Sequence, residues 1–177
     1  MLHKTETMGA EDHKKHAPKR VRVFVITVSD TRTEETDTSG KAAKELIAFA
    51  GHEVSGYRVL KDEPAEVAAL IRQIVETGEQ READAIVLSG GTGISSRDST
   101  YEAVASLLDK QLDGFGELFR MLSFQEIGAA AMLSRAVGGI YRGVVVFATP
   151  GSTPAVRLAL ERLILPELGH LAFEARR

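Results

Sequence analysis

Short runs of apolar residues recur along the chain, separated by longer segments in which apolar residues follow helical spacing. The runs VRVFVITV, AIVLS and GVVVFA occupy residues 21–28, 85–89 and 143–148. Nearly continuous, β-branched runs of this length are typical of strands in a parallel sheet, where both faces are buried. The segment from Glu53 to Leu60 is interpreted as a further strand. The pattern therefore predicts four strands.

Between the strands, capping residues and glycines mark where helices begin and end. Residues 114–136 have a mixed composition, and a loop with one or two short helices is expected there. Two expected helices have both ends marked: the first runs from Thr38 or Ser39 to Gly51, and the second from Pro64 to Gly78. A third helix is expected to begin at the capping-box pattern Ser99-Thr100-Tyr101-Glu102, and a fourth after the turn Thr149–Pro154.

The alternation of strands and helices predicts an α/β fold with a mainly parallel sheet and helices on both faces. Residues 1–20 contain almost no large apolar side chain and are interpreted as a flexible, charged N-terminal tail. The chain shows no repeats and no low-complexity linker. Residues 21–177 are therefore expected to form a single domain.

Composition narrows the class of partner. Net charge is −3, aromatic residues make up 6 % of the chain and Trp is absent, so neither a basic coat nor a stacking surface for nucleic acid is present. No apolar run has the length of a membrane span, so no membrane partner is expected. The absence of Cys excludes disulfides and thiolate metal sites, and it is consistent with a cytoplasmic protein.

The turn Gly90-Gly91-Thr92-Gly93 follows the third strand directly. Three glycines in four residues allow backbone N–H groups to approach a ligand closely, and such groups beside a helix N-terminus favour a phosphate. The turn is neither a dinucleotide fingerprint nor a Walker A loop. Tight packing alone is the alternative explanation for these glycines.

Further unusual residues follow other strands, where ligands bind in open α/β sheets. Ser29 and Asp30 follow the first strand, Asp62 follows the second, and Asp98 lies beyond the glycine-rich turn. Two carboxylates beside a phosphate-type loop suggest Mg²⁺ and nucleotide chemistry, because Mg²⁺ bridges carboxylates to phosphates. Alternatively, Asp62 is a polar lead-in to the next helix, and Asp98 complements a helix dipole. Arg97 either contacts a phosphate or pairs with a surface carboxylate.

Several linked segments resemble one family. LSGGTGISSRDSTYEA at residues 88–103 resembles the signature of the MoaB/MogA family of molybdenum cofactor biosynthesis proteins, and GFGELFRMLSFQEIG at 114–128 resembles its MoaB branch. VSDTR at 28–32, LSRA at 133–136 and TPGS at 149–152 are similar as well. The resemblance covers roughly residues 20–172, with the segments in the expected order.

This resemblance implies a three-layer α/β/α sandwich with a mixed, mainly parallel sheet, which assembles as a homo-oligomeric trimer or hexamer. It implies a molybdopterin adenylyltransferase, a nucleotidyltransferase whose substrates are ATP and molybdopterin and whose metal is Mg²⁺. The family's two important aspartates correspond to Asp62 and Asp98, to which catalysis and metal binding are assigned together. The residues expected to bind nucleotide or pterin are Ser29, Asp30, Gly90, Gly91, Thr92, Gly93, Arg97, Gly114, Phe115, Gly116, Glu117, Ser134, Pro150, Gly151 and Ser152.

Two other functions stay open. A paralogue of this family could bind molybdopterin without turnover, and a nucleotide pyrophosphatase could use the same type of domain, although the segment 114–128 argues against the latter. The sequence also leaves open whether the apolar side chains near Phe119, Met121, Leu122 and Phe124 form core or an oligomer interface.

Overall fold

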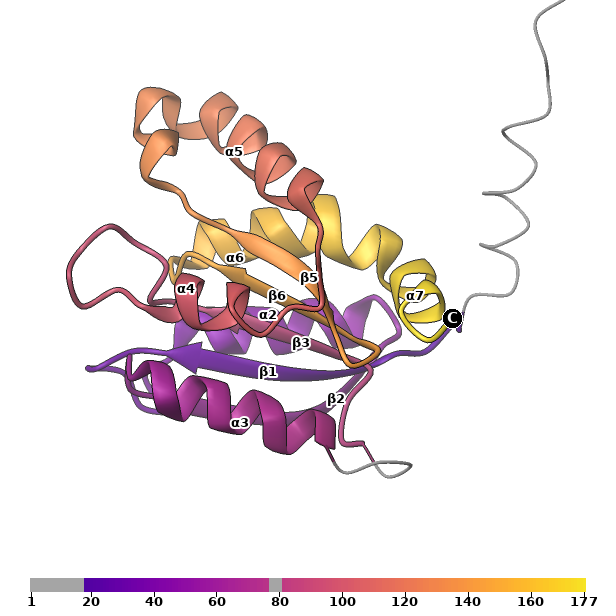
Figure 1. The fold of residues 1–177 in the computed structure, drawn as a ribbon. Coiled ribbons are helices and arrows are strands. Elements are labelled where there is room, and N and C mark those ends of the chain that lie inside the picture. The colour runs from indigo at the N-terminus through magenta and orange to yellow at the C-terminus, as the bar shows by residue number, and fades with distance from the viewer. Residues whose placement is uncertain (1–17, 77–80) are drawn as a thin grey trace, which may run out of the picture.

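The computed structural model describes residues 18–76 and 81–177. Its centre is a six-stranded mixed sheet with the strand order β2-β1-β3-β6-β5-β4 (Figure 1). Strands β1, β2, β3 and β6 are parallel, whereas β5 is antiparallel to β6 and β4 is antiparallel to β5. The strands are β1 (Arg22–Val28), β2 (Glu53–Leu60), β3 (Ala85–Ser89), β4 (Lys110–Gln111), β5 (Val137–Tyr141) and β6 (Val144–Thr149).

Helices cover both faces of the sheet, which gives three layers (Figure 1). Alternate side chains of β1 enter different cores, because Val23 and Val25 pack with one set of helices while Phe24 and Ile26 pack with the other. Helices α3 (Pro64–Glu76) and α4 (Thr100–Ala105) cover one face. The other face is covered by α2 (Thr38–Phe49), α5 (Asp113–Ile127), α6 (Thr153–Ala159), the π-helical turn η3 (Leu160–Ile164) and α7 (Leu165–Glu174). The predicted three-layer α/β/α fold is confirmed.

Several boundaries differ from the sequence-based expectation. Helix α2 has Asp37 as its N-cap, not Thr38 or Ser39, because the Asp37 carboxylate accepts the Gly40 N–H at 3.0 Å. The predicted capping box at Ser99 does not form, since the Ser99 hydroxyl donates to Asp62 Oδ1 instead.

The region predicted as a loop with short helices is mostly the fifteen-residue helix α5, followed by the 3₁₀ segment η2 (Gly128–Leu133). Phe115, Phe119 and Leu122 lie at helical spacing and are buried, so tertiary packing outweighs the low helix propensity of the glycines at its start. Strands β4 and β5 were not predicted, because VGGIY carries two glycines where a strand pattern expects side chains.

Some predictions fall outside the described residues. These are the helix end at Gly78 and residues 1–17 of the expected charged tail. Among the helices that the structure describes, none is long and apolar enough to cross a membrane.

Candidate functional site

A pocket of about 420 Å³ opens where the parallel strands β1, β3 and β6 end. The glycine-rich turn after β3 is joined to the end of β6 there, since the Gly90 N–H donates to the Thr149 carbonyl at 2.9 Å. Figure 1 shows the long loop after β3 extending from the same end of the sheet as the tip of β1. The pocket is lined by Val28, Ser29, Thr31, Arg32, Gly90, Gly91, Thr92, Gly93, Asp98, Leu133, Ser134, Pro150 and Gly151.

The glycine-rich turn has a conformation that requires glycine at two positions. Gly90 and Gly91 have φ angles of +102° and +65°. A Cβ on Gly90 would overlap the Val28 carbonyl oxygen, and a Cβ on Gly91 would overlap the side chains of Thr100 and Asp62. The turn therefore packs closely against the end of β1, and its four residues line the pocket.

The two aspartates lie on either side of this turn. Asp62 is 9 % exposed and does not line the pocket; its Oδ1 accepts hydrogen bonds from the hydroxyls of Ser99 at 2.9 Å and Thr100 at 3.4 Å. Asp98 lines the pocket, and its Oδ2 accepts the Ser95 N–H at 2.9 Å. A Cβ on Gly93 would lie 2.6 Å from Asp98 Oδ2, so this carboxylate packs directly against the turn.

The same two carboxylates retain the capacity to bind a cation. Among the described residues, Oδ2 of Asp62 and Oδ1 of Asp98 accept no hydrogen bond. No group of three or more His, Asp or Glu side chains within residues 18–76 and 81–177 is arranged to hold a metal ion. Mg²⁺ commonly takes only one or two carboxylates, with water and substrate phosphate completing its six ligands. Each of these two carboxylates therefore has one oxygen without a hydrogen bond from the described residues, and Mg²⁺ binding there stays a prediction.

Arg97 pairs with surface carboxylates, which is one of the two roles that the sequence left open. Its guanidinium lies 2.9 Å from Asp30 Oδ2 and 3.7 Å from Glu63 Oε1, and the side chain is 64 % exposed. This hydrogen bond from Arg97 and the Asp62 N–H together keep the pKa of Asp30 below its ordinary value. Contact between Arg97 and a phosphate stays a prediction.

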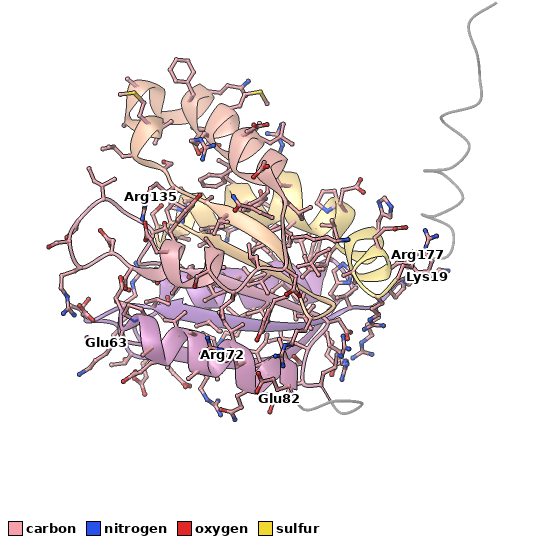
Figure 2. All side chains as sticks on the ribbon, in the orientation of Figure 1. Lys19, Glu63, Arg72, Glu82, Arg135 and Arg177 are labelled. Atoms are coloured by element: carbon pink, nitrogen blue, oxygen red, sulfur yellow. The ribbon has the colours of Figure 1, made fainter. Side chains whose placement is uncertain are left out.

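Arg135 connects the glycine-rich turn to α4, and sequence reasoning assigned it no role. Its Nε donates to the Thr92 carbonyl at 2.9 Å, its guanidinium pairs with Glu102, and the guanidinium carbon lies 4.6 Å from the centre of the Tyr101 ring. Figure 2 shows Arg135 close to the loop after β3. The sequence feature that could have identified Arg135 is its position in the segment LSRA at 133–136, next to Ser134, which was predicted to bind the ligand. Arg135 therefore holds one wall of the pocket.

Arg32 is a second residue that sequence reasoning did not assign to the site. It lines the pocket, and its Nη1 donates to the Gly151 carbonyl at 3.0 Å, which links the loops after β1 and β6. The residue was visible in the segment VSDTR, but nothing in its spacing distinguished it from a surface arginine.

The predicted binding residues divide into two groups. The structure brings one group together in the pocket: Ser29, Gly90, Gly91, Thr92, Gly93, Asp98, Ser134, Pro150 and Gly151. Asp30, Asp62 and Arg97 lie behind or beside the glycine-rich turn, and Ser152 caps α6 by accepting the Ala155 N–H.

The segment Gly114–Glu117 lies outside this pocket. Gly114 and Phe115 line a mainly apolar cavity of about 590 Å³ between α5 and α7, and Gly116 and Glu117 line a smaller one of about 180 Å³ beside Tyr101. Their proposed contact with the nucleotide or pterin stays a prediction.

Comparison with known proteins identifies the class to which this pocket belongs. Residues 24–170 match the family described as a probable molybdopterin binding domain. The chain therefore belongs to the MoaB/MogA family of molybdenum cofactor biosynthesis proteins.

Individual relatives agree with this assignment. Molybdenum cofactor biosynthesis protein B of Bacillus cereus is 54 % identical over 172 residues, which cover 96 % of this chain and 99 % of that protein. A crystal structure of molybdenum cofactor biosynthesis protein B has 52 % identity and a TM-score of 0.84, covering 92 % and 99 % of the two chains. The tungsten cofactor synthesizing protein MoaB from Pyrococcus furiosus has 40 % identity and a TM-score of 0.80, covering 91 % and 100 %.

Proposed function

We propose that this protein adenylylates molybdopterin, with MgATP as the donor of the AMP group. The observation that carries the proposal is the pocket at the ends of β1, β3 and β6, where a glycine-rich turn lies between two aspartates. A glycine-rich turn and the Asp98 carboxylate on one cavity, with Asp62 behind the turn, suit a reaction between two phosphorylated substrates bridged by a cation.

In the proposed reaction, an oxygen of the pterin's terminal phosphate attacks the α-phosphorus of ATP. A new P–O bond forms, the bond between the α-phosphorus and its bridging oxygen breaks, and pyrophosphate leaves with the bonding electrons. Transfer of this kind depends on positioning and charge neutralisation more than on covalent catalysis. The backbone N–H groups of Gly91 and Gly93 would bind phosphate oxygens, and Asp98 would orient the reacting groups from the pocket wall.

Asp62 and Asp98 are the residues that would hold Mg²⁺, through the carboxylate oxygens that accept no hydrogen bond among the described residues. When bound, Mg²⁺ would neutralise charge on the phosphates and on the leaving pyrophosphate. Ser99 and Thr100 fix the orientation of Asp62 from behind the turn.

A molybdopterin-binding protein without turnover is the second candidate. It is favoured by the position of Asp62, which does not line the pocket. Its Oδ1 accepts hydrogen bonds from the hydroxyls of Ser99, the N-cap of α4, and Thr100, the first residue of that helix. In this case Asp62 would only fasten α4 to the loop after β2.

The homo-oligomer is also part of the proposal, and the surface of α5 supports it. Phe119 and Leu122 are buried in the core, but Met121 and Phe124 are 51 % and 61 % exposed. Leu118 and Ile127 extend this surface, and Met132 and Leu133 of η2 add to it. Large apolar side chains gathered on one helix and the adjoining turn are typical of a surface that another subunit covers.

The experiment that tests the proposed function follows both products of one reaction. The protein is incubated without oxygen with molybdopterin and MgATP, and adenylylated molybdopterin and pyrophosphate are quantified. Equal amounts of the two products, with neither formed when molybdopterin is omitted, are expected. Binding of molybdopterin without either product would favour the non-catalytic candidate, and pyrophosphate without adenylylated pterin would contradict both.

A further inference from the structure

Arg32 occupies a distinctive place in the pocket. Among the described residues that line it, Arg32 is the one with a cationic side chain. Its guanidinium is fixed from one side, because Nη1 donates to Ser39 Oγ at 2.6 Å and to the Gly151 carbonyl at 3.0 Å, and lies 3.4 Å from Asp37 Oδ1.

The groups that fix Arg32 are themselves held rigidly. The Asp37 side chain is fully buried and accepts hydrogen bonds from the Tyr57 hydroxyl at 2.6 Å, Ser39 Oγ at 2.8 Å and the Gly40 N–H at 3.0 Å. Burial alone would raise the pKa of Asp37, but hydrogen bonds from Thr27, Tyr57, Gly40 and Ser39 outweigh it and lower the pKa to about 2. Asp37 is therefore a buried carboxylate that stays ionised and holds Arg32 in one orientation.

The other edge of the guanidinium has no assigned partner. Within the described part of the chain, Nε and Nη2 of Arg32 donate no hydrogen bond, and the side chain is 31 % exposed. These two N–H groups lie parallel on one edge, which is the arrangement that binds two oxygens of a phosphate at once.

A second polar group of the pocket also lacks a partner. Thr92 is 1 % exposed and lines the pocket, and its Oγ1 is buried without a hydrogen bond to any described residue. Leaving a buried hydroxyl unpaired is unfavourable, so Thr92 is a polar residue of the pocket wall whose hydroxyl the described residues do not satisfy.

Other cations near the turn are already engaged. Arg97 pairs with Asp30 at 2.9 Å, and Arg135 makes two hydrogen bonds of 2.6 and 3.1 Å to the Glu102 carboxylate. Neither lines the pocket, so the positive charge that the pocket itself presents comes from Arg32.

We propose that Arg32 binds a phosphate group of the ligand through its Nε–Nη2 edge, and that Asp37 is the residue that positions it. The proposal rests on the proposed function for the nature of the ligand, which carries a phosphate either in ATP or at the end of molybdopterin. Tyr57 acts through Asp37, whereas Ser39 contacts Arg32 directly and also donates to Asp37.

Titration calorimetry under anaerobic conditions separates the two sources. Adenosine, MgATP and molybdopterin are titrated separately into wild type, Arg32→Gln, Arg32→Lys and a control, Arg157→Gln, which removes an exposed arginine paired only along α6 and η3. In Arg32→Gln, the affinity for one phosphate ligand is expected to fall about 10- to 100-fold, the loss of a hydrogen bond to a charged group.

The pattern of losses identifies the source. If the loss falls on MgATP while adenosine binds as before, Arg32 holds a phosphate of the nucleotide; if it falls on molybdopterin, Arg32 holds the pterin's phosphate. Arg32→Lys, which keeps the charge without the paired N–H groups, should lose less than Arg32→Gln. Wild-type affinity for both phosphate ligands in a folded Arg32→Gln protein would overturn the proposal.

A measurement on wild-type protein avoids dependence on how the variants fold. The side-chain Nε–H signal of Arg32 is assigned by its absence from the ¹⁵N spectrum of Arg32→Lys, and ligand is added to wild type. A shift of this signal at saturation with the phosphate ligand, but not with adenosine, is expected. An unmoved signal at saturation would overturn the proposal.

The role of Asp37 has its own readout. Asp37→Asn should raise the KM of the ligand whose phosphate Arg32 holds and leave the KM of the other substrate unchanged, whereas a purely structural role would lower stability and leave both KM values unchanged. Pyrophosphate release on the same samples separates this proposal from the proposed function. Phosphate binding through Arg32 without pyrophosphate release would support the proposed role of Arg32 and exclude adenylyl transfer. Pyrophosphate release by Arg32→Gln with unchanged KM values would support adenylyl transfer and exclude the proposed role of Arg32.

Discussion

The Tyr57 hydroxyl on β2 donates a 2.6 Å hydrogen bond to the carboxylate of Asp37, the N-cap of α2. Through this contact the edge strand β2 fixes the start of α2. Asp37 and Ser39, which lie there, both contact Arg32 at the pocket. Burial and the Asp37 carboxylate together raise the pKa of Tyr57, so the phenol stays protonated and remains a donor. The pocket is thus supported from outside the loops that line it.

Replacing Tyr57 by Phe should destabilise the protein by about 1 to 3 kcal/mol, because a buried carboxylate loses a hydrogen bond. The pKa of Asp37 is lowered to about 2 in the folded protein, whereas an unfolded chain has an Asp pKa near 3.9. The ionised carboxylate therefore stabilises the fold fully above about pH 4, and this stabilisation is lost as the pH falls from about 4 to about 2. The cost of Tyr57→Phe should therefore shrink across this range. Urea unfolding between pH 2 and pH 7 measures it.

The matched control is Tyr141→Phe, which removes a phenol hydroxyl from a residue that is also largely buried but contacts no carboxylate in the described structure. Its effect on stability should not change between pH 4 and pH 2. A cost of Tyr57→Phe that is equally independent of pH would contradict the assignment of an ionised Asp37.

Gly91→Ala should reduce turnover by about 100-fold, because displacement of a reacting group by about 1 Å has an effect of this size. A Cβ on Gly91 would lie 2.5 Å from Asp62 Oδ2 and would displace that carboxylate. Gly51→Ala is the control, since Gly51 also has a positive φ, of +85°, but a Cβ there meets nothing within 4 Å. Gly51→Ala should lower stability by about 1 to 2 kcal/mol without loss of turnover. Equal turnover in the two variants would show that Asp62 need not stay in place.

Arg135→Ala should loosen the glycine-rich turn, because the Thr92 carbonyl loses its hydrogen bond from Nε. Hydrogen exchange at the Gly90 and Thr100 amides, which bond to Thr149 and Gly91, should accelerate about tenfold. Glu102→Gln removes the partner charge and keeps the bond to Thr92, so it should have a smaller effect. Unchanged exchange in Arg135→Ala would place the rigidity of the turn elsewhere.

Phe124→Glu should break the proposed homo-oligomer, since it places a charge within the exposed apolar surface of α5. Sedimentation of wild type should give a multiple of the 19.2 kDa chain mass, and that of Phe124→Glu the chain mass itself. Phe49→Glu changes a side chain that is 93 % exposed on α2, a helix that contributes none of the residues of this surface, and should leave the assembly intact. A monomeric wild type would exclude the oligomer.

The sequence predicted the parts of the fold in which local pattern and tertiary structure agree. The limits of β2 and β3 were predicted correctly, and β1 and β6 to within one residue. Both faces of β1, β3 and β6 are covered, and their runs are nearly continuous in apolar residues. Strand β5 was not predicted because the need for one of its glycines comes from a residue of the neighbouring strand. A Cβ on Gly138 would lie 2.6 Å from the Phe147 ring of β6. A local pattern does not contain such a contact.

In the candidate site, too, the residues were predictable from the local sequence, but the contacts between separate segments were not. The glycine-rich turn and Asp98 were identified from neighbouring residues, and the pocket contains them. The supporting contacts join residues far apart in the chain, such as Arg32 with Gly151 and Arg135 with Thr92. Their partners are backbone carbonyls, which every residue possesses, so no pattern of residue types could reveal them.

The most direct test of the account is pyrophosphate release from MgATP, with and without molybdopterin, by wild type, Asp62→Ala and Asp98→Ala. Wild type is expected to release pyrophosphate only when molybdopterin is present, and both variants are expected to lose release while the fold is retained. Wild type that binds molybdopterin but releases no pyrophosphate, or folded variants that release it at the wild-type rate, would contradict the proposed role of the two aspartates beside the glycine-rich turn.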